Sequence, residues 1–406
     1  MADFEITREL TRSSGGKILL LVMDGLGGLP KEPGGPTELE AARTPNMDRL
    51  AAEGTTGLSI PIARGIAPGS GPAHLAIFGY DPIRYQIGRG VLECIGIGMT
   101  IGPHDVAIRG NFCTVDANGL ITDRRAGRIP TEKCAELVEK LRVIHIPPYE
   151  FDIQPVQDYR FGLIIRGAGL SAEVHDTDPQ VVGKAPLPAV ARTPEAQPTA
   201  DLVNGWIRQA AEILKHERPA NMLTLRGFSM DPALPKFAEV YKLKAACVAV
   251  YPMYKGVSQL VGMDVIETDI HDAPADEFKR VVAQYQAGYD FVFCHIKYTD
   301  SRGEDGNFDA KVKVIEAVDE ALPILLDEAR PDVIVITGDH STPSTYKAHS
   351  WHPVPTLLWA PKTHLPDRAT RFGERECMGG GLGQFPATDL MPLALAHADR
   401  MNKFGA

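Results

Sequence analysis

The sequence predicts an α/β protein in which a mostly parallel sheet, flanked by helices, is interrupted by a smaller inserted α+β domain. Two observations lead to this prediction. Strand and helix patterns alternate in the two outer thirds of the chain, whereas the middle third is rich in hairpins. Three runs, namely 18–23, the part of 289–300 up to Ile296, and 333–337, are almost wholly apolar, which is typical of strands that helices cover on both faces. We expect the main domain to comprise residues 1–104 and 236–406, and the inserted domain residues 105–235.

The first part of the main domain continues after strand 18–23 with two helices. Thr44, Pro45 and Gly54 are start and stop signals for a short helix over 44–54. Residues 67–82 predict a tight turn that leads into a helix. Residues 83–100 are too rich in glycine for a helix of any length.

The inserted domain begins with alternating residues around an Asp-Ala-Asn-Gly turn, the signature of a β-hairpin over 111–131. A proline-rich stretch at 176–200 predicts an ordered loop or lid. The other expected elements are a helix over 132–142, strands over 159–170 and 221–229, and an amphipathic helix over 201–216.

The second part of the main domain returns to the first pattern. Residues 245–256 predict a strand whose end places Tyr254 and Lys255 in a loop. A helix over 276–287 precedes the strand that leads to Asp300, and apolar residues at helical spacing over 310–329 form a core stripe. His349 and His352 stand just before a further apolar strand.

Polar residues follow each of the three apolar runs. These polar residues include Asp24 after the first run, Asp300 after the second, and the pair Asp339 and His340 after the third. In a parallel sheet these ends meet at one edge, where three like charges are costly unless a cation neutralises them. A site for two metal ions such as zinc or manganese resolves this cost. The alternative is a polar turn in which Asp339 caps the next element.

Ser70 lies between Gly69 and Gly71, just ahead of an apolar helix. A hydroxyl at such a position can attack phosphorus or bind a metal, although Gly-Ser-Gly is also ordinary loop chemistry. Arg124, Arg125 and Arg128 are either a solvated face or a clamp for an anion.

Composition excludes some classes of function. The chain has 406 residues, 44% of them hydrophobic, and a formal net charge of −10, so nothing favours nucleic acid as a partner. Six scattered cysteines without CxxC spacing are typical of reduced thiols. The start has no apolar segment of a signal peptide, and no run approaches the ~20 apolar residues of a membrane span. We therefore expect a cytoplasmic protein without membrane partners; a homo-oligomer stays an open alternative.

Six motifs in the same order strongly resemble the cofactor-independent phosphoglycerate mutases of the archaeal type, members of the alkaline phosphatase superfamily. The resemblance runs from Lys17 to about Met391. The motifs are MDG at 23–25, PGSGPAHLAIFGYDP at 68–82, TDRRAGR at 122–128, YTDSRGEDG at 298–306, TGDHSTP at 337–343 and HSWHPVP at 349–355.

The resemblance implies an alkaline-phosphatase-like fold, two divalent metal ions (manganese, zinc, cobalt or magnesium) and no 2,3-bisphosphoglycerate. One ion is held by Asp24, Ser70, Asp339 and His340, and Ser70 also accepts the phosphoryl group. Asp300 and His349 hold the other. The family usually has a histidine where this chain has Glu304, so either Glu304 or His352 completes the second site, or Glu304 is a solvated carboxylate.

The resemblance also assigns the substrate-binding residues. Lys255 lies near the transferring phosphoryl group, and the inserted domain clamps the substrate with Arg124, Arg125, Arg128, Arg166 and Arg226. The implied reaction converts 3-phosphoglycerate to 2-phosphoglycerate through a phosphoserine, a step of glycolysis and gluconeogenesis. Gly71 stands where many relatives have an acidic residue, and the loss of that carboxylate would alter how the substrate glycerate is held.

Two alternatives share parts of this pattern. A metal-dependent phosphatase, phosphonate hydrolase or phosphoryl transferase acting on a related small acid would use the same serine and metals. A metal- or nucleotide-binding protein without turnover ranks last. The motif GLGG at 25–28 does not match the dinucleotide fingerprint G-x-G-x-x-G, because the glycine required at its last position is missing.

Overall fold

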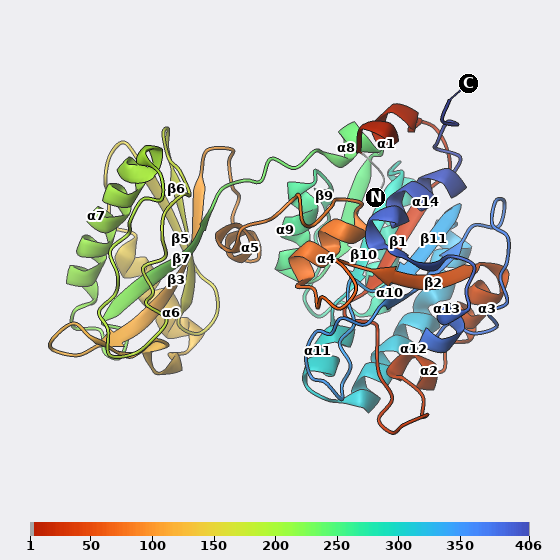
Figure 1. Ribbon diagram of the computed structural model, residues 1–406, viewed down its shortest axis with the longest axis horizontal. Coiled ribbons are helices and arrows are strands. Elements are labelled where there is room, and N and C mark those ends of the chain that lie inside the picture. Colours follow the sequence, from red (N-terminus) through yellow and green to blue (C-terminus); the bar gives the residue numbers. More distant parts are fainter. Residues whose placement is uncertain (1–3, 406) are drawn as a thin grey trace. The chain divides into compact units, whose positions relative to one another are not determined.

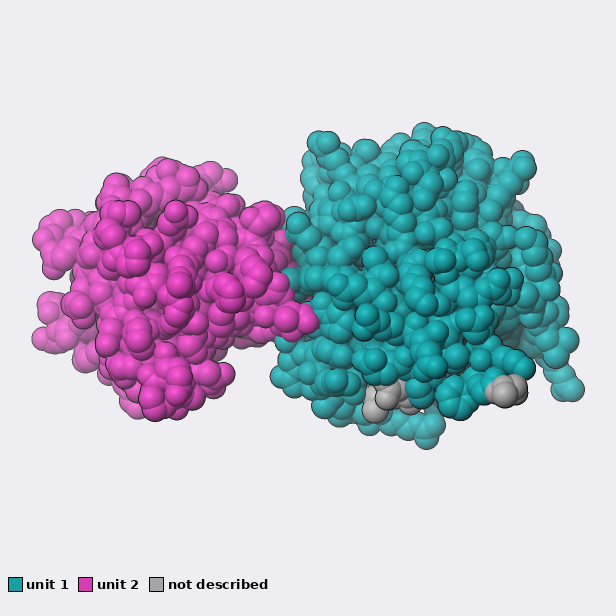
Figure 2. Space-filling view, turned by 90° about the horizontal axis from the view of Figure 1, so that it is seen from above, with its two compact units in different colours: residues 1–86, 234–406 teal, residues 87–233 magenta. Residues whose placement is uncertain are grey.

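The computed structural model describes residues 4–405 and divides into two compact units. Unit 1 comprises residues 1–86 and 234–406, and unit 2 comprises residues 87–233 (Figure 2). Unit 2 thus begins at Ile87, earlier in the chain than the boundary near 105 that the sequence suggests. The reason is the segment before β3, which packs against strands of unit 2. Within residues 4–405, no helix is long and apolar enough to cross a membrane.

Unit 1 is built on an eight-stranded sheet with the order β13-β2-β12-β11-β1-β10-β8-β9 (Figure 1). The strands β11, β1, β10 and β8 pair in parallel with one another in this order, while β12 runs antiparallel to β11 and to β2. The predicted α/β fold with a mostly parallel sheet is confirmed. The strands are β1 (Ile18–Met23), β2 (Thr55–Ile60), β8 (Ala245–Ala249), β9 (Asp264–Val265), β10 (Phe291–Ile296), β11 (Val333–Thr337), β12 (Val354–Trp359) and β13 (Gly383–Pro386).

Helices cover both faces of this sheet. On one face, Leu19, Leu21 and Met23 of β1 share a core with α3, α10 and α12. On the other face, the ring of Phe78, which caps α4, packs edge-on against Phe293 of β10 at a centroid distance of 4.8 Å. The helices of unit 1 are α1 (Phe4–Leu10), α2 (Glu38–Ala41), α3 (Pro45–Glu53), α4 (Ser70–Ile77), α8 (Phe237–Val240), α9 (Pro252–Leu260), α10 (Pro274–Gln286), α11 (Tyr298–Glu304), α12 (Phe308–Ile324), α13 (Glu374–Met378) and α14 (Leu390–His397).

Unit 2 is a five-stranded antiparallel sheet in which β3 lies between β6 and β7. Helices α6 and α7 cover one face through a core that includes Phe112, Leu163 and Trp206. The elements are α5 (Arg89–Ile95), β3 (Val106–Val115), β4 (Ile121–Asp123), α6 (Thr131–Leu141), β5 (Glu150–Pro155), β6 (Arg160–Arg166), α7 (Gln197–Leu214) and β7 (Met222–Ser229). The predicted hairpin is the β3–β4 pair.

Two local predictions are wrong. The glycine-rich segment 83–100 does contain a helix, α5. Its Gly90 lies so close to the carbonyl oxygen atoms of Ala107 and Gly227 that a side chain would collide with them, so this glycine serves close packing rather than a turn. Lys255 lies in helix α9 and not in a loop, because Pro252 occupies the first turn and starts the helix.

Candidate metal and phosphoryl-transfer site

Three side chains at the carboxyl edge of the unit 1 sheet direct ligand atoms at one another. Asp24 follows β1, and Asp339 and His340 follow β11, which pairs with β1 in parallel. His340 Nε2 lies 3.4 Å from Asp24 Oδ1 and 3.2 Å from Asp339 Oδ2. All three side chains are buried, and none of these three atoms has a hydrogen-bond partner. Two carboxylates and one imidazole in this arrangement match the donors that divalent transition metals take.

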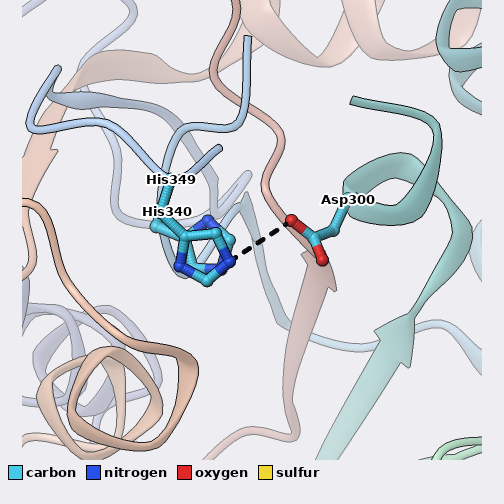
Figure 3. Close-up of side chains that lie close together, drawn as sticks. All are labelled: Asp300, His340 and His349. Carbon is cyan, nitrogen blue, oxygen red and sulfur yellow. Dashed lines mark ion pairs between the residues drawn. The ribbon is translucent and has the colours of Figure 1, made fainter. Parts of the chain in front are cut away.

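A second group shares His340 with the first. Asp300, on α11, lies with its Oδ1 3.7 Å from His349 Nε2 (Figure 3). The His349 ring stacks on the His340 ring at a centroid distance of 3.6 Å. Asp300, His340 and His349 could hold a metal ion, since one donor atom from each lies within 4.8 Å of the others. The structure thus brings together five of the residues expected to bind metal.

Burial sets the charge of these groups. It raises the pKa of Asp24 to about 7, with the charge of Asp339 adding to the effect, and raises the pKa of Asp339 to about 6. Burial also lowers the pKa of His340 to about 3, which keeps its imidazole neutral and able to act as a ligand. Buried carboxylates this close together are stabilised by a cation.

A hydrogen-bond relay orients His340. Thr342 Oγ1 donates to Asp300 Oδ1 over 2.7 Å, so it accepts from His340 Nδ1 at 3.0 Å. With the proton on Nδ1, His340 Nε2 presents a lone pair to Asp24 and Asp339. The relay therefore prepares the imidazole for a metal ion in the way that outer hydrogen bonds commonly do.

Ser70 is the first residue of α4, and its segment contacts both ligand groups. The carbonyl oxygen of Pro68 lies 2.9 Å from His349 Nδ1. One turn further along α4, His74 Nδ1 lies 2.8 Å from the Ser70 carbonyl oxygen and 3.3 Å from Asp339 Oδ2. The backbone on both sides of Ser70 is thus fixed to the residues that surround the ligand atoms.

Glu304 and His352 differ in their surroundings. Glu304 Oε1, on a half-exposed side chain at the end of α11, lies 3.8 Å from His349 Nε2. His352 Nδ1 instead lies 3.0 Å from Ser350 Oγ, and its ring stacks on Trp351. The structure therefore places Glu304, but not His352, beside the second group.

Lys255 has no hydrogen bond or ion pair through its side chain to any described ligand residue; its neighbour Tyr254 donates a short hydrogen bond to Asp24 Oδ2. The ammonium group beside the carboxylates belongs to Lys297, whose Nζ lies 2.8 Å from Asp24 Oδ2 and 2.7 Å from Asp300 Oδ2. Lys297 stands only three residues before Asp300, a spacing that could have drawn attention to it.

The five arginines expected to clamp a substrate all lie in unit 2, but the structure does not gather them. Arg124 and Arg226 share Asp178, at 2.8 and 3.4 Å. Arg166 is held elsewhere by Asp105 and Asp152 and by the carbonyl oxygen of Thr100.

The remaining two arginines, Arg125 and Arg128, are exposed in the turn after β4. Neither side chain has a hydrogen bond or ion pair with the described residues. They are therefore free to meet a ligand, but nothing orients them toward Arg124.

Sequence reasoning missed a buried support behind the ligand loops. The ammonium group of Lys311, on α12, donates to the carbonyl oxygens of Gly25, Gly27 and Thr342 at 2.7, 3.1 and 2.9 Å. It thereby joins the loop that carries Asp24 to the loop that carries His340. The signal was present, because helical spacing places Lys311 on the same apolar stripe as Phe308 and Ile315.

Two buried histidines were missed as well. His74 lies in an otherwise apolar helix, and His295 Nε2, on β10, lies 3.7 Å from Asp24 Oδ2. Neither His295 nitrogen has a hydrogen-bond partner among residues 4–405. A histidine inside an apolar run was the only available signal, and it is equally typical of a packed core.

The fold and the site together define an α/β protein with a carboxylate- and imidazole-rich candidate metal site at the edge of a mostly parallel sheet. Residues 51–221 match the family model of 2,3-bisphosphoglycerate-independent phosphoglycerate mutase. A probable enzyme of this name from Thermus thermophilus is 49% identical over 405 residues, covering 99% of both chains. One from Aquifex aeolicus is 49% identical over 415 residues, covering 99% of this chain and all of its own.

Solved structures agree with these sequence matches. The cofactor-independent phosphoglycerate mutase of Thermoplasma acidophilum is 30% identical, with a TM-score of 0.78 over 94% of this chain and all of its own. A Pyrococcus horikoshii protein is 33% identical, with a TM-score of 0.79 over 97% of this chain and all of its own. The chain belongs to the 2,3-bisphosphoglycerate-independent phosphoglycerate mutase family.

Proposed function

We propose that this chain interconverts 3-phosphoglycerate and 2-phosphoglycerate through a phosphoserine at Ser70, with two divalent metal ions and no 2,3-bisphosphoglycerate. One observation carries the proposal: Asp24 Oδ1, Asp339 Oδ2 and His340 Nε2 face one another, buried and without partners. Buried polar atoms are normally satisfied, so three orphaned ligand atoms at one point support a metal site in this member of the family.

We assign one ion to Asp24, Ser70, Asp339 and His340, and the other to Asp300, His349 and Glu304. Bound there, divalent ions would supply positive charge to the phosphoryl oxygens and lower the pKa of a coordinated hydroxyl group. Carboxylate and imidazole donors suit manganese, zinc, cobalt and, less well, magnesium.

The residues of the chain carry the transfer. Ser70 Oγ loses its proton and attacks phosphorus, the bond from phosphorus to the glycerate 3-oxygen breaks, and that oxygen takes up a proton. The 2-hydroxyl group of glycerate then loses its proton and attacks the phosphoserine, the bond from phosphorus to Ser70 Oγ breaks, and Ser70 Oγ regains a proton. We assign Lys255 and Arg226 to neutralising charge on the transferring group, and Arg124, Arg125, Arg128 and Arg166 to binding the anionic substrate. We also propose that this reaction serves glycolysis and gluconeogenesis in the cytoplasm.

The test is an enolase-coupled assay of metal-loaded protein with 3-phosphoglycerate and no bisphosphoglycerate, with phosphate release followed in parallel. We expect 2-phosphoglycerate with little free phosphate. Treatment with a chelator should abolish the activity, and manganese should restore it. Free phosphate without 2-phosphoglycerate would instead identify a phosphatase on a related small acid.

The second ion provides a separate prediction. We expect Glu304→Gln to lower the affinity for the second of two manganese ions by roughly tenfold or more. Even substitutions outside the ligand shell commonly lower metal affinity by ~10- to 100-fold. His352→Gln, the matched control, should leave both affinities unchanged because His352 bonds to Ser350. Equilibrium dialysis of manganese measures both variants. A loss confined to His352→Gln would reverse the assignment.

A further inference from the structure

Two arginines of unit 2 that are not part of the expected clamp, Arg109 and Arg160, lie beside one glutamate. Arg109 Nη1 and Arg160 Nη1 each lie 3.7 Å from a carboxylate oxygen of Glu93, on α5. The group lies on the sheet face opposite α6 and α7: Phe112 on β3 points into the core with these helices, whereas Arg109 and Asn111 have the opposite parity along the strand.

Strand register places a further arginine on this face. Arg109 on β3 pairs directly with Arg226 on β7, and Asn111 pairs with Arg160 on β6. Directly paired residues of antiparallel strands have side chains on the same face. Arg109, Arg160 and Arg226 therefore project from three adjacent strands toward the same side.

The hydrogen-bonding capacity of Arg109 is largely unused. Its one side-chain hydrogen bond within residues 4–405 is a long contact of 3.4 Å from Nε to Asn111 Oδ1. At 3.7 Å, Glu93 is too far away for a hydrogen bond, and its Oε1 is buried without a partner. A half-buried guanidinium group with free donors is prepared for an anion that is not part of the chain.

The positive charge around Arg109 also favours an anion at this site. Burial lowers the pKa of Arg109, and the nearby charges of Arg160 and Arg89 lower it further. Arg109 and Arg160 thus face one glutamate, which leaves an excess of one positive charge beside Glu93 in a chain with a net charge of −10. Like charges of this kind are stabilised when a dianion binds.

We propose that Arg109 and Arg160 form an anion-binding site on this face, for the phosphoryl or carboxylate group of a small phosphorylated acid, with Glu93 partly neutralising the two arginines until the anion binds. The site rests on the proposed function for the identity of its ligand, and it assigns substrate binding to two residues outside the expected clamp.

The test is calorimetric titration of the Ser70→Ala protein, which cannot turn over, with 3-phosphoglycerate and with inorganic sulfate. We expect Arg109→Gln and Arg160→Gln each to lower the affinity for both anions by roughly 10- to 100-fold. This is the change that the loss of one hydrogen bond to a charged group produces. Arg208→Gln, which removes an exposed arginine from α7 of the same unit, is the matched control and should have no effect.

Glu93→Gln separates the proposal from a purely structural ion-pair group. A binding site gains affinity, by roughly 3- to 10-fold, when a competing negative charge is removed. A structural group would lose thermal stability without any gain in affinity, and that result, or unchanged binding in both arginine variants, would overturn the proposal. If the unmodified protein forms no 2-phosphoglycerate while sulfate binding still responds as expected, the proposed function fails and the anion site stands.

Discussion

Ser70→Ala is expected to reduce formation of 2-phosphoglycerate by roughly four to six orders of magnitude, the range seen when an enzyme loses its nucleophile. Ser70 supplies the only oxygen that we propose to accept the phosphoryl group. The variant should still bind manganese, because Asp24, Asp339 and His340 remain in place and their positions depend on strands β1 and β11. The coupled assay measures the loss, and manganese titration measures what is retained.

The control for this variant is Ser14→Ala, which removes an exposed hydroxyl group from the segment before β1 and should leave activity unchanged. Detection of phosphoserine in the unmodified protein, and its absence from Ser70→Ala, would link the loss to the covalent step. Activity within tenfold of the unmodified protein would rule out Ser70 as the acceptor.

Lys311→Met is expected to lower the free energy of unfolding of unit 1 by about 3–5 kcal/mol, the cost of removing one partner from a buried charged network. The change leaves the carbonyl oxygens of Gly25, Gly27 and Thr342 without their shared donor. It also removes the positive charge near the buried carboxyl groups of Glu38 and Glu374. Urea unfolding followed by circular dichroism, without metal, measures the difference.

Lys313→Met is the matched control, since it makes the same change at an exposed position on the same helix. Surface substitutions of this kind usually stay within about 0.5 kcal/mol. If Lys311→Met were as stable as this control, the carbonyl oxygens would have found other donors and Lys311 would not be needed to join the two loops.

The sequence was most informative where a buried strand ended. A strand covered on both faces must be apolar throughout, so the first charged residue after it marks the sheet edge. Asp24 and Asp339 were found in this way, and the parallel register of β1 with β11 brings them together. Asp300 is less direct, because it lies in α11 rather than at the end of β10.

Contacts between distant residues could not be read from the sequence. Nothing in the sequence indicated that Arg166 pairs with Asp105 and Asp152. Arg109 carries no local signal, since alternation along β3 would equally fit a solvated arginine. Lys311 was overlooked because a lysine in a helix is normally exposed. Its burial is explained by hydrogen bonds to three carbonyl oxygens from two loops that are remote in the sequence.

The insertion between β2 and β8 also bears on how the chain is made. Unit 2 is one continuous stretch, residues 87–233, and its sheet can form once that stretch has left the ribosome. Unit 1 cannot do so, because β1 lies between β10 and β11, and β2 between β12 and β13, all from its second part. Domains generally fold as units during synthesis. The inserted unit can therefore fold first, whereas β1 and β2 can pair only after β10, β11, β12 and β13 have been synthesised.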